Sequence, residues 1–356
     1  MFNKLAKFTL PLVFGLFALI CLPALLAKAD APPQISAVAA VVIDQASGKV
    51  LYDKDMNAEH YPASTTKVLT ALLTLENMDI DDKITLPEDY VNVGETSIGL
   101  KAGARQTVEE LLMALMLYSA NDAGQALAIG VAGTEEAFVE MMNQRVSALG
   151  LQHTHFCNPH GLHNEDHYTS AYDLAMIARV AMDNPEFRRI VTTDSFTVRK
   201  LNGEDNFTVG NRNSLLSQYE YADGIKTGYT RQAGNCIVAS ATKNDMQLIV
   251  VVLNSPNIYE ESQALLEWGF DNSQHNLLVS ANEVKANVKV LNGGRNQVEV
   301  IAEKSLYSVM RTDENINVQE SLDLPNSVPA PIHRGEVIGS VTYTDKNGYT
   351  YSTDLL

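Results

Sequence analysis

Cysteine is scarce in this chain of 356 residues, which has three cysteines and a single tryptophan. Cys21 lies in an apolar N-terminal segment, so only Cys157 and Cys236 remain to cross-link the rest of the chain. Two cysteines are too few to staple a fold of this size, even in an oxidising compartment. One bridge between them is possible but cannot be deduced from the sequence, and we expect buried thiols.

Basic residues are also under-represented: 26 Lys and Arg stand against 43 Asp and Glu, a formal net charge of -17. The average field of such a chain repels polyanions, which argues against nucleic acid as a partner. Hydrophobic residues make up 46% and charged residues 19%, a globular composition that excludes disorder for most of the length. The length exceeds what one core usually organises, so we expect a large and a small folded unit.

The first 29 residues have the pattern of an export signal. Lys4 and Lys7 precede a charge-free apolar stretch at 8–27, and residues 27–29 (AKA) offer small side chains where a signal peptidase reads. We expect a signal peptide at 1–29, cleaved after Ala29; an uncleaved anchor is the alternative, because the stretch could just span a bilayer. The protein is then exported, to the periplasm or cell envelope or into the medium.

Hydrophobic periodicity and turn signals divide the remaining chain in two. The first part has strands at both ends of a helical block, which predicts an α+β fold with one antiparallel sheet flanked by helices. Past residue 271, short Val, Ile, Thr and Tyr runs without helical period predict a small all-β domain. We place the two domains at 30–275 and 276–356. The expected elements are a hairpin at 35–52, helices at 62–75, 107–118, 122–132, 134–149, 170–183 and 258–270, and strands at 235–243 and 247–254.

Three short motifs together indicate chemistry: Ser64–Lys67 (STTK), Ser119–Asn121 (SAN) and Lys226–Gly228 (KTG). Ser240–Lys243 (SATK) repeats the first pattern. On the helix expected for the first motif, residues three apart share a face, whereas on the strand expected for the repeat they point to opposite faces. Only the first motif can therefore transfer a proton from serine to lysine.

A serine hydroxyl becomes a nucleophile only when a neighbouring base takes its proton, and a neutral lysine can be that base. Burial and a second cation both lower a lysine pKa, so Lys226 would keep Lys67 neutral. Ser119 could relay a proton to the leaving amine, Asn121 could hold a substrate amide and Thr227 could bind a carboxylate. A Lys-Thr-Gly segment on a strand edge can also pair with an extended peptide.

These motifs, in this order, resemble the penicillin-binding serine enzymes. In detail they are similar to the D-alanyl-D-alanine carboxypeptidases of low molecular mass, the family of penicillin-binding protein 5. The resemblance covers about residues 35–356 and implies the penicillin-binding, β-lactamase-like transpeptidase fold followed by a small β-rich domain, with no metal or cofactor. The segments that carry it are 62–67 (PASTTK), 119–123 (SANDA), 158–162 (NPHGL) and 223–230 (DGIKTGYT).

The resemblance also implies a role for each site residue. Ser64 would form the acyl-enzyme, Lys67 would be its base, and the backbone N–H groups of Ser64 and Tyr229 would form an oxyanion hole. Arg212 would help bind the terminal carboxylate. The expected reaction removes the terminal D-alanine from peptidoglycan stem pentapeptides, and β-lactams would be covalent inhibitors. The catalytic residues are thus Ser64, Lys67 and Ser119, and the substrate-binding residues Asn121, Arg212, Lys226, Thr227, Gly228 and Tyr229.

The chain departs from this family in two places. Many members end in an amphipathic membrane-binding helix, whereas this chain ends at 353–356 after a strand-like run, so we expect no C-terminal membrane anchor of that kind. Tyr229 stands where relatives often have histidine, which puts the turnover rate in doubt. The expected oxyanion donor is a backbone group and survives that change.

Other functions remain open from the motifs alone. A class A β-lactamase shares the nucleophile, the lysine and KTG, but it needs an E-x-x-L-N segment that does not occur between Ser119 and Lys226. The motifs do not separate a carboxypeptidase from a D,D-endopeptidase. A non-catalytic wall-binding or penicillin-sensing protein is a further alternative. Five histidines at 153–167 lack the spacing of a zinc motif, so turn structure is the favoured interpretation there.

Overall fold

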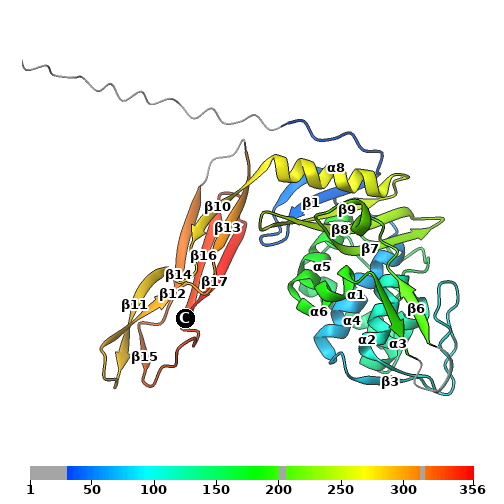
Figure 1. Cartoon of the computed structure of the whole chain (residues 1–356), viewed down its shortest axis with the longest axis horizontal. Coiled ribbons are helices and arrows are strands. Elements are labelled where there is room, and N and C mark those ends of the chain that lie inside the picture. Colours follow the sequence, from blue (N-terminus) through cyan, green and yellow to red (C-terminus); the bar gives the residue numbers. More distant parts are fainter. Residues whose placement is uncertain (1–29, 200–205, 313–316) are drawn as a thin grey trace, which may run out of the picture.

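The computed structural model describes residues 30–199, 206–312 and 317–356. The expected signal peptide at 1–29 lies outside these residues. Figure 1 shows a larger body of helices around a sheet and a smaller body built of strands, which follow each other along the chain at helix α8 (Ile258–Asp271) and strand β10 (Ser273–Val279). In the described ranges, no helix is both long and apolar enough to cross a bilayer.

The larger body is organised by one five-stranded antiparallel sheet, in the order β2-β1-β9-β8-β7. Its strands come from both ends of the segment, as the sequence predicted. Strand β7, which carries the Lys-Thr-Gly motif, lies at one edge, so the prediction of an edge position is confirmed. The strands are β1 (Ala39–Asp44), β2 (Val50–Lys54), β7 (Ala222–Thr230), β8 (Gly234–Lys243) and β9 (Met246–Leu253).

Helices cover both faces of this sheet, which explains why β1 and nearly all of β9 are buried. Alternate side chains along a strand point to opposite faces. Val41 and Val251 accordingly join the core under the helical block, where α5 (Ala171–Asp183) packs on β1 and β9. Val42 and Val250 belong to a second core beneath α8.

The helical block confirms the expected helices to within a few residues, including the capping box formed by Thr107 and Glu110. Two predictions need correction. The helix expected from Pro62 begins as a 3₁₀ turn, η1, and the helix expected to end at Tyr118 closes with a π-helical turn, η2. The remaining elements are η1 (Ala63–Thr66), α1 (Lys67–Asn77), α2 (Val108–Met113), η2 (Ala114–Tyr118), α3 (Asn121–Ala132), α4 (Glu135–Ala148), α6 (Pro185–Thr192) and α7 (Leu215–Gln218). Two further antiparallel strand pairs are β3 (Lys83–Thr85) with β4 (Arg105–Thr107) and β5 (Ser195–Val198) with β6 (Phe207–Gly210).

In its described residues, the smaller body has strands and no helix, as expected, in three small sheets ordered β10-β13, β12-β11-β15 and β14-β16-β17. Its core is modest and includes Val300, Val341 and Leu355. The expected domain boundary, between residues 275 and 276, falls within β10. Its other strands are β11 (Val284–Leu291), β12 (Gln297–Ile301), β13 (Leu306–Arg311), β14 (Val318–Asp323), β15 (Ser327–Pro329), β16 (Gly339–Asp345) and β17 (Thr350–Leu355).

Cys157 and Cys236 are both free thiols, so the bridge that the sequence left open does not form. Cys236 is fully buried, and burial raises its pKa to about 11. Cys157 is only partly buried, so the expectation of buried thiols holds for one of the two. The described fold is held together by its apolar cores rather than by cross-links.

Candidate active site

Ser64 and Lys67 lie at the junction of η1 and α1, where the chain passes from a 3₁₀ turn into an α-helix. Residues three apart eclipse each other in a 3₁₀ turn. Lys67 Nζ accordingly lies 2.9 Å from Ser64 Oγ. Ala63, directly before the serine, has a φ of 50°, a left-handed conformation that is costly for a residue with a Cβ. The local fold thus holds serine and lysine together at some conformational cost.

The ammonium position of Lys67 is surrounded by oxygen atoms. Besides Ser64 Oγ, Nζ contacts Asn121 Oδ1 at 2.8 Å and the backbone carbonyl of His160. A neutral amine has two N–H groups and one lone pair, whereas a carbonyl or amide oxygen can only accept. The two N–H groups are therefore taken by Asn121 and His160, and the lone pair is left to face the Ser64 hydroxyl. This is the orientation that a general base for Ser64 requires.

The electrostatic environment favours the neutral form of this lysine. Lys67 is fully buried, and burial lowers its pKa well below the usual value, with the charge of Lys226 lowering it further. The pKa of Lys226 is itself lowered to about 7, first by burial and then by Arg212. The prediction that burial and Lys226 act together on Lys67 is confirmed.

Strand β7 passes directly over the nucleophile. A Cβ atom on Gly228 would lie 2.8 Å from Ser64 N and 3.0 Å from Thr65 N, so only glycine fits there. This close approach brings the backbone on either side of Gly228 against the start of η1. Tyr229, the next residue, is 66% exposed, so its side chain can contact a ligand in the cleft that it lines.

The Ser-Ala-Asn motif is shaped by the π-helical turn η2. Ser119 follows that turn with a φ of 69°, and α3 starts two residues later at Asn121. The sharp change of direction lets Ser119 line the same cleft as Ser64 while Asn121 lies buried beside Lys67. The sequence placed these residues near the end of a helix but gave no signal for the π turn.

One cleft of about 530 Å³ unites most of the expected residues. Lys67, Asn121 and Lys226 are buried and do not line it. Thr96 and the first turn of α8 complete its walls, and neither was expected from the sequence. The expected residues that line it are Ser64, Ser119, Arg212, Thr227, Gly228 and Tyr229.

Arg212 is held at the rim of the cleft from two sides. Its guanidinium carbon lies 4.1 Å from the centre of the Tyr118 ring, a cation–π arrangement. Its backbone N–H donates to Leu117 O, and its carbonyl accepts from the Tyr259 hydroxyl at 3.2 Å. An arginine fixed in this way can offer its guanidinium to a carboxylate at the end of a peptide.

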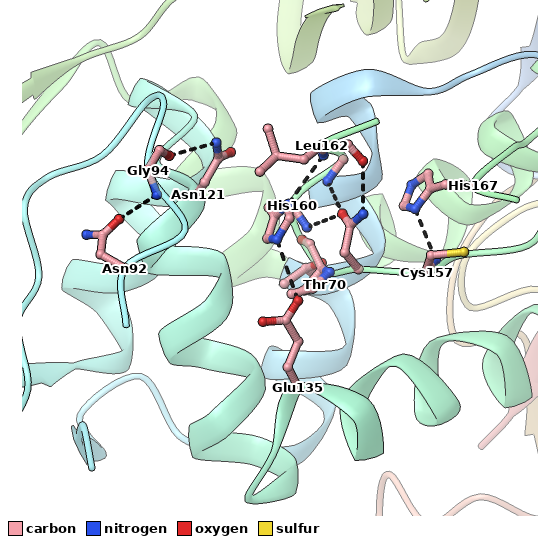
Figure 2. Close-up of polar contacts among 12 residues, drawn as sticks. Thr70, Asn92, Gly94, Asn121, Glu135, Cys157, His160, Leu162 and His167 are labelled. Atoms are coloured by element: carbon pink, nitrogen blue, oxygen red, sulfur yellow. Dashed lines mark hydrogen bonds and ion pairs between the residues drawn. The ribbon is translucent and has the colours of Figure 1, made fainter. Parts of the chain in front are cut away.

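The Asn-Pro-His-Gly-Leu segment forms a tight turn, of which Figure 2 labels His160 and Leu162. Asn158 accepts from Gly161 N at 2.7 Å and donates to Leu162 O at 2.9 Å, which closes the turn. Gly161 has a φ of +84°, and a Cβ there would collide with Ala63 O. The turn is thus pressed against η1 and presents the His160 carbonyl to Lys67.

The sequence did not predict a role for three supporting residues, Asp122, Glu135 and His167. The buried carboxylate of Asp122 accepts hydrogen bonds from the 92–100 loop, including Ser97 Oγ at 2.6 Å. Glu135 Oε1 lies 3.5 Å from His160 Nε2 (Figure 2). The His167 ring contacts Thr66 Oγ1 at 2.8 Å. Burial lowers the pKa of His167 to about 3, so this histidine is neutral. Of these three residues, only Asp122 had a signal in the sequence, because it directly follows the Ser-Ala-Asn motif.

The second Ser-x-x-Lys segment lies on a strand instead of a helix. Ser240 and Lys243 lie on β8, where the Ser240 hydroxyl donates to Asp223. The Lys243 ammonium instead lies 5.4 Å from the centre of the Tyr221 ring. The prediction that strand geometry separates this pair is confirmed.

Comparison with known proteins shows the family to which the chain belongs. A family model described as D-alanyl-D-alanine carboxypeptidase, peptidase family S11, matches residues 26–257. The chain belongs to this carboxypeptidase family. A second model, the C-terminal domain of penicillin-binding protein 5, matches residues 274–356. The range that contains the three motifs and the β-rich extension therefore each match a family model.

Individual carboxypeptidases match over most of the chain. D-alanyl-D-alanine carboxypeptidase DacF of Bacillus subtilis (strain 168) is 33% identical over 343 residues, which is 93% of this chain and 88% of the relative. DacA of Escherichia coli (strain K12) is 33% identical over 331 residues, 87% of this chain and 80% of the relative. These matches support a serine-type carboxypeptidase rather than the β-lactamase alternative.

Solved structures agree with the fold. Penicillin-binding protein 5 from Haemophilus influenzae has a TM-score of 0.69 at 32% identity and covers 92% of this chain and 97% of its own. The Streptomyces K15 DD-transpeptidase has a TM-score of 0.64 at 32% identity and covers 68% of this chain and all of its own. The penicillin-binding protein fold predicted from the motifs is confirmed.

Proposed function

We propose that Ser64 of this carboxypeptidase attacks the carbonyl carbon between the last two D-alanine residues of a peptidoglycan stem pentapeptide. Lys67 takes the hydroxyl proton as the Ser64 Oγ–carbon bond forms. The developing oxyanion accepts hydrogen bonds from the backbone N–H groups of Ser64 and Tyr229. Ser119 relays this proton from Lys67 to the departing nitrogen, the carbon–nitrogen bond breaks and D-alanine leaves, so that Lys67 is neutral again. Water then hydrolyses the ester and restores the free serine.

The observation that carries this proposal is the arrangement around Lys67. A fully buried lysine with a lowered pKa is poised to be neutral, and its two fixed acceptors leave the lone pair for Ser64. A structural role for this lysine would favour a charged ammonium paired with a carboxylate. Its direct contacts are instead the serine hydroxyl, an amide oxygen and a backbone carbonyl.

Substrate recognition follows from the edges of the cleft. Arg212 and Thr227 bind the terminal carboxylate, and the edge of β7 pairs with the extended peptide. Asn121 Nδ2 donates one hydrogen to Gly94 O at 3.3 Å and retains a second for a substrate amide. Lys226 adds positive charge beneath the carboxylate. A β-lactam presents a strained amide and a carboxylate in the same relation, so the same groups would bring it to Ser64.

We further propose that the chain is exported, with a signal peptide at 1–29 removed after Ala29. The catalytic domain is then 30–275 and the β-rich domain 276–356. N-terminal sequencing of the protein from a bacterial host, together with salt-washed membrane fractionation, tests this. A retained Met1 with the protein in the membrane pellet would overturn the proposed cleavage.

Product analysis tests the reaction. Purified mature protein is incubated with diacetyl-lysyl-D-Ala-D-Ala, and mass spectrometry should find the peptide shortened by one D-alanine. In parallel, intact mass and peptide mapping after penicillin treatment should locate one covalent adduct on Ser64. An unshortened peptide, or an adduct on Ser240 with none on Ser64, would refute the assignment.

A further inference from the structure

Glu95 occupies a fixed position beside the catalytic groups. The residues on either side of it are both bonded to Asn121: the Asn121 N–H donates to Thr96 O at 2.7 Å, and its side-chain amide donates to Gly94 O at 3.3 Å (Figure 2). Glu95 is thus the apex of a turn clamped onto the residue that holds Lys67. Its φ of 57° is a left-handed conformation that glutamate rarely adopts, and such outliers concentrate at functional sites.

The loop that carries Glu95 is anchored at its base. Asp122, which is fully buried, accepts hydrogen bonds from the backbone N–H groups of Ile98 and Leu100 at 3.1 and 2.9 Å. It also accepts from the Asn92 side chain at 3.1 Å. Both ends of the turn are therefore tied to the start of α3, and the exposed Glu95 side chain projects from a rigid frame.

The charge of Glu95 acts against the proposed base. Its carboxylate raises the pKa of both Lys67 and His160. The other charges that act on Lys67 are Lys226 and Arg212, which lower its pKa, and the buried Asp122, which raises it. Because catalysis requires a neutral Lys67, an exposed acid at this position is a disadvantage in the empty site. A cationic group on the substrate would remove that disadvantage by neutralising the carboxylate.

We propose that Glu95 binds an ammonium group on the side chain of the substrate residue that precedes the two D-alanines. This inference rests on the proposed function. Thr96, the neighbour of Glu95, lines the cleft together with Tyr229 of β7. A peptide paired with β7 advances about 3.3 Å per residue away from Ser64, and the four-carbon stem of a lysine-like side chain can reach across the cleft.

The binding step would also assist the reaction. When the ammonium pairs with Glu95, the carboxylate no longer stabilises the charged form of Lys67. The pKa of Lys67 then falls, and a larger fraction of the base is neutral. A substrate with a free side-chain amine should therefore be both bound more tightly and acylated over a wider pH range than one whose amine is blocked.

Two peptides and two variants test the proposal. The peptides are acetyl-lysyl-D-Ala-D-Ala, which has a free ε-amine, and its diacetyl counterpart. The test variant is Glu95→Gln. The control variant is Glu88→Gln, which removes an exposed acid earlier in the same loop. The unaltered enzyme should prefer the free amine by about threefold to fivefold in kcat/KM, the size of an exposed ion pair. Glu95→Gln should abolish that preference, mainly through KM, and Glu88→Gln should keep it.

A pH profile provides a readout that loop stability would not move. With the diacetyl peptide, the acidic limb of kcat/KM should lie at lower pH in Glu95→Gln, because removing the carboxylate lowers the pKa of Lys67. An enzyme without preference for the free amine, a Glu95→Gln variant that keeps it, or equal effects of both variants would overturn the inference. The proposed function fails in a different way, by the absence of both hydrolysis and penicillin labelling.

Discussion

The chain contains two Ser-x-x-Lys segments that share their spacing and differ in their structure. Ser64 and Lys67 meet because a 3₁₀ turn stacks residues three apart, so Nζ and Oγ are 2.9 Å from each other. Ser240 and Lys243 diverge because successive side chains on a strand alternate between faces. A motif therefore has chemical meaning only together with the backbone conformation that carries it.

The surroundings of the two lysines differ as much as the backbone does. Lys67 is fully buried among neutral oxygen atoms and has a lowered pKa. Lys243 remains partly exposed, lies near two aromatic rings and approaches Asp271 Oδ1 at 3.7 Å. The first environment favours a neutral base, whereas the second places the lysine beside a carboxylate and two aromatic rings.

Replacing the serines gives the largest expected difference between the two segments. Ser64→Ala removes the nucleophile and should reduce acylation by penicillin by about 10⁴-fold or more. Ser240→Ala removes only a hydroxyl bonded to Asp223 and should leave acylation intact. Stopped-flow acylation kinetics compares the two. Normal acylation of Ser64→Ala would show that Ser64 is not the nucleophile and that the two segments do not differ in this respect.

Replacing the lysines should give the next largest effect. Lys67→Arg keeps a positive charge but removes an accessible neutral base, so acylation should fall by at least about a hundredfold. Lys243→Arg keeps the charge near the rings and should acylate at the normal rate. If Lys67→Arg acylates normally, some other group activates Ser64.

The strand above the first segment provides a third comparison. A methyl group at Gly228 would press on Ser64 N, so Gly228→Ala should displace the nucleophile and lower acylation by about tenfold or more. Gly294→Ala, in the β-rich domain, meets no atom within 4 Å and should behave as the unaltered enzyme. Circular dichroism controls for folding. Equal acylation of the two variants would contradict the close approach of β7.

The smallest effect is expected in the pH dependence. Lys226 lowers the pKa of Lys67, so Lys226→Gln should raise that pKa and move the acidic limb of acylation to higher pH. The measured quantity is the pH at which the acidic limb lies, and not the acylation rate itself, because the variant should also bind penicillin more weakly. Lys243→Gln should not move it. If the acidic limb of acylation lies at the same pH in Lys226→Gln as in the unaltered enzyme, Lys226 does not lower the pKa of Lys67.

Elements whose signals are local could be predicted from the sequence. The capping box at Thr107 and Glu110 starts a helix because both partners lie within one turn. The apolar run of β9 predicts a buried strand, and the spacing of Ser64 and Lys67 predicts a shared face for either kind of helix. These features depend on neighbours a few positions away, so they can be recognised in the sequence.

The orientation and the pKa of Lys67, in contrast, depend on residues that are remote in the sequence and could not be predicted from it. The His160 carbonyl that orients Lys67 is 93 positions away in the chain, and Asn121 is 54 positions away. The pKa of Lys67 depends on burial and on Lys226, and the place of Glu95 depends on its clamp to Asn121. Desolvation and charge interactions are set by distances in space, and folding alone brings such remote residues within range.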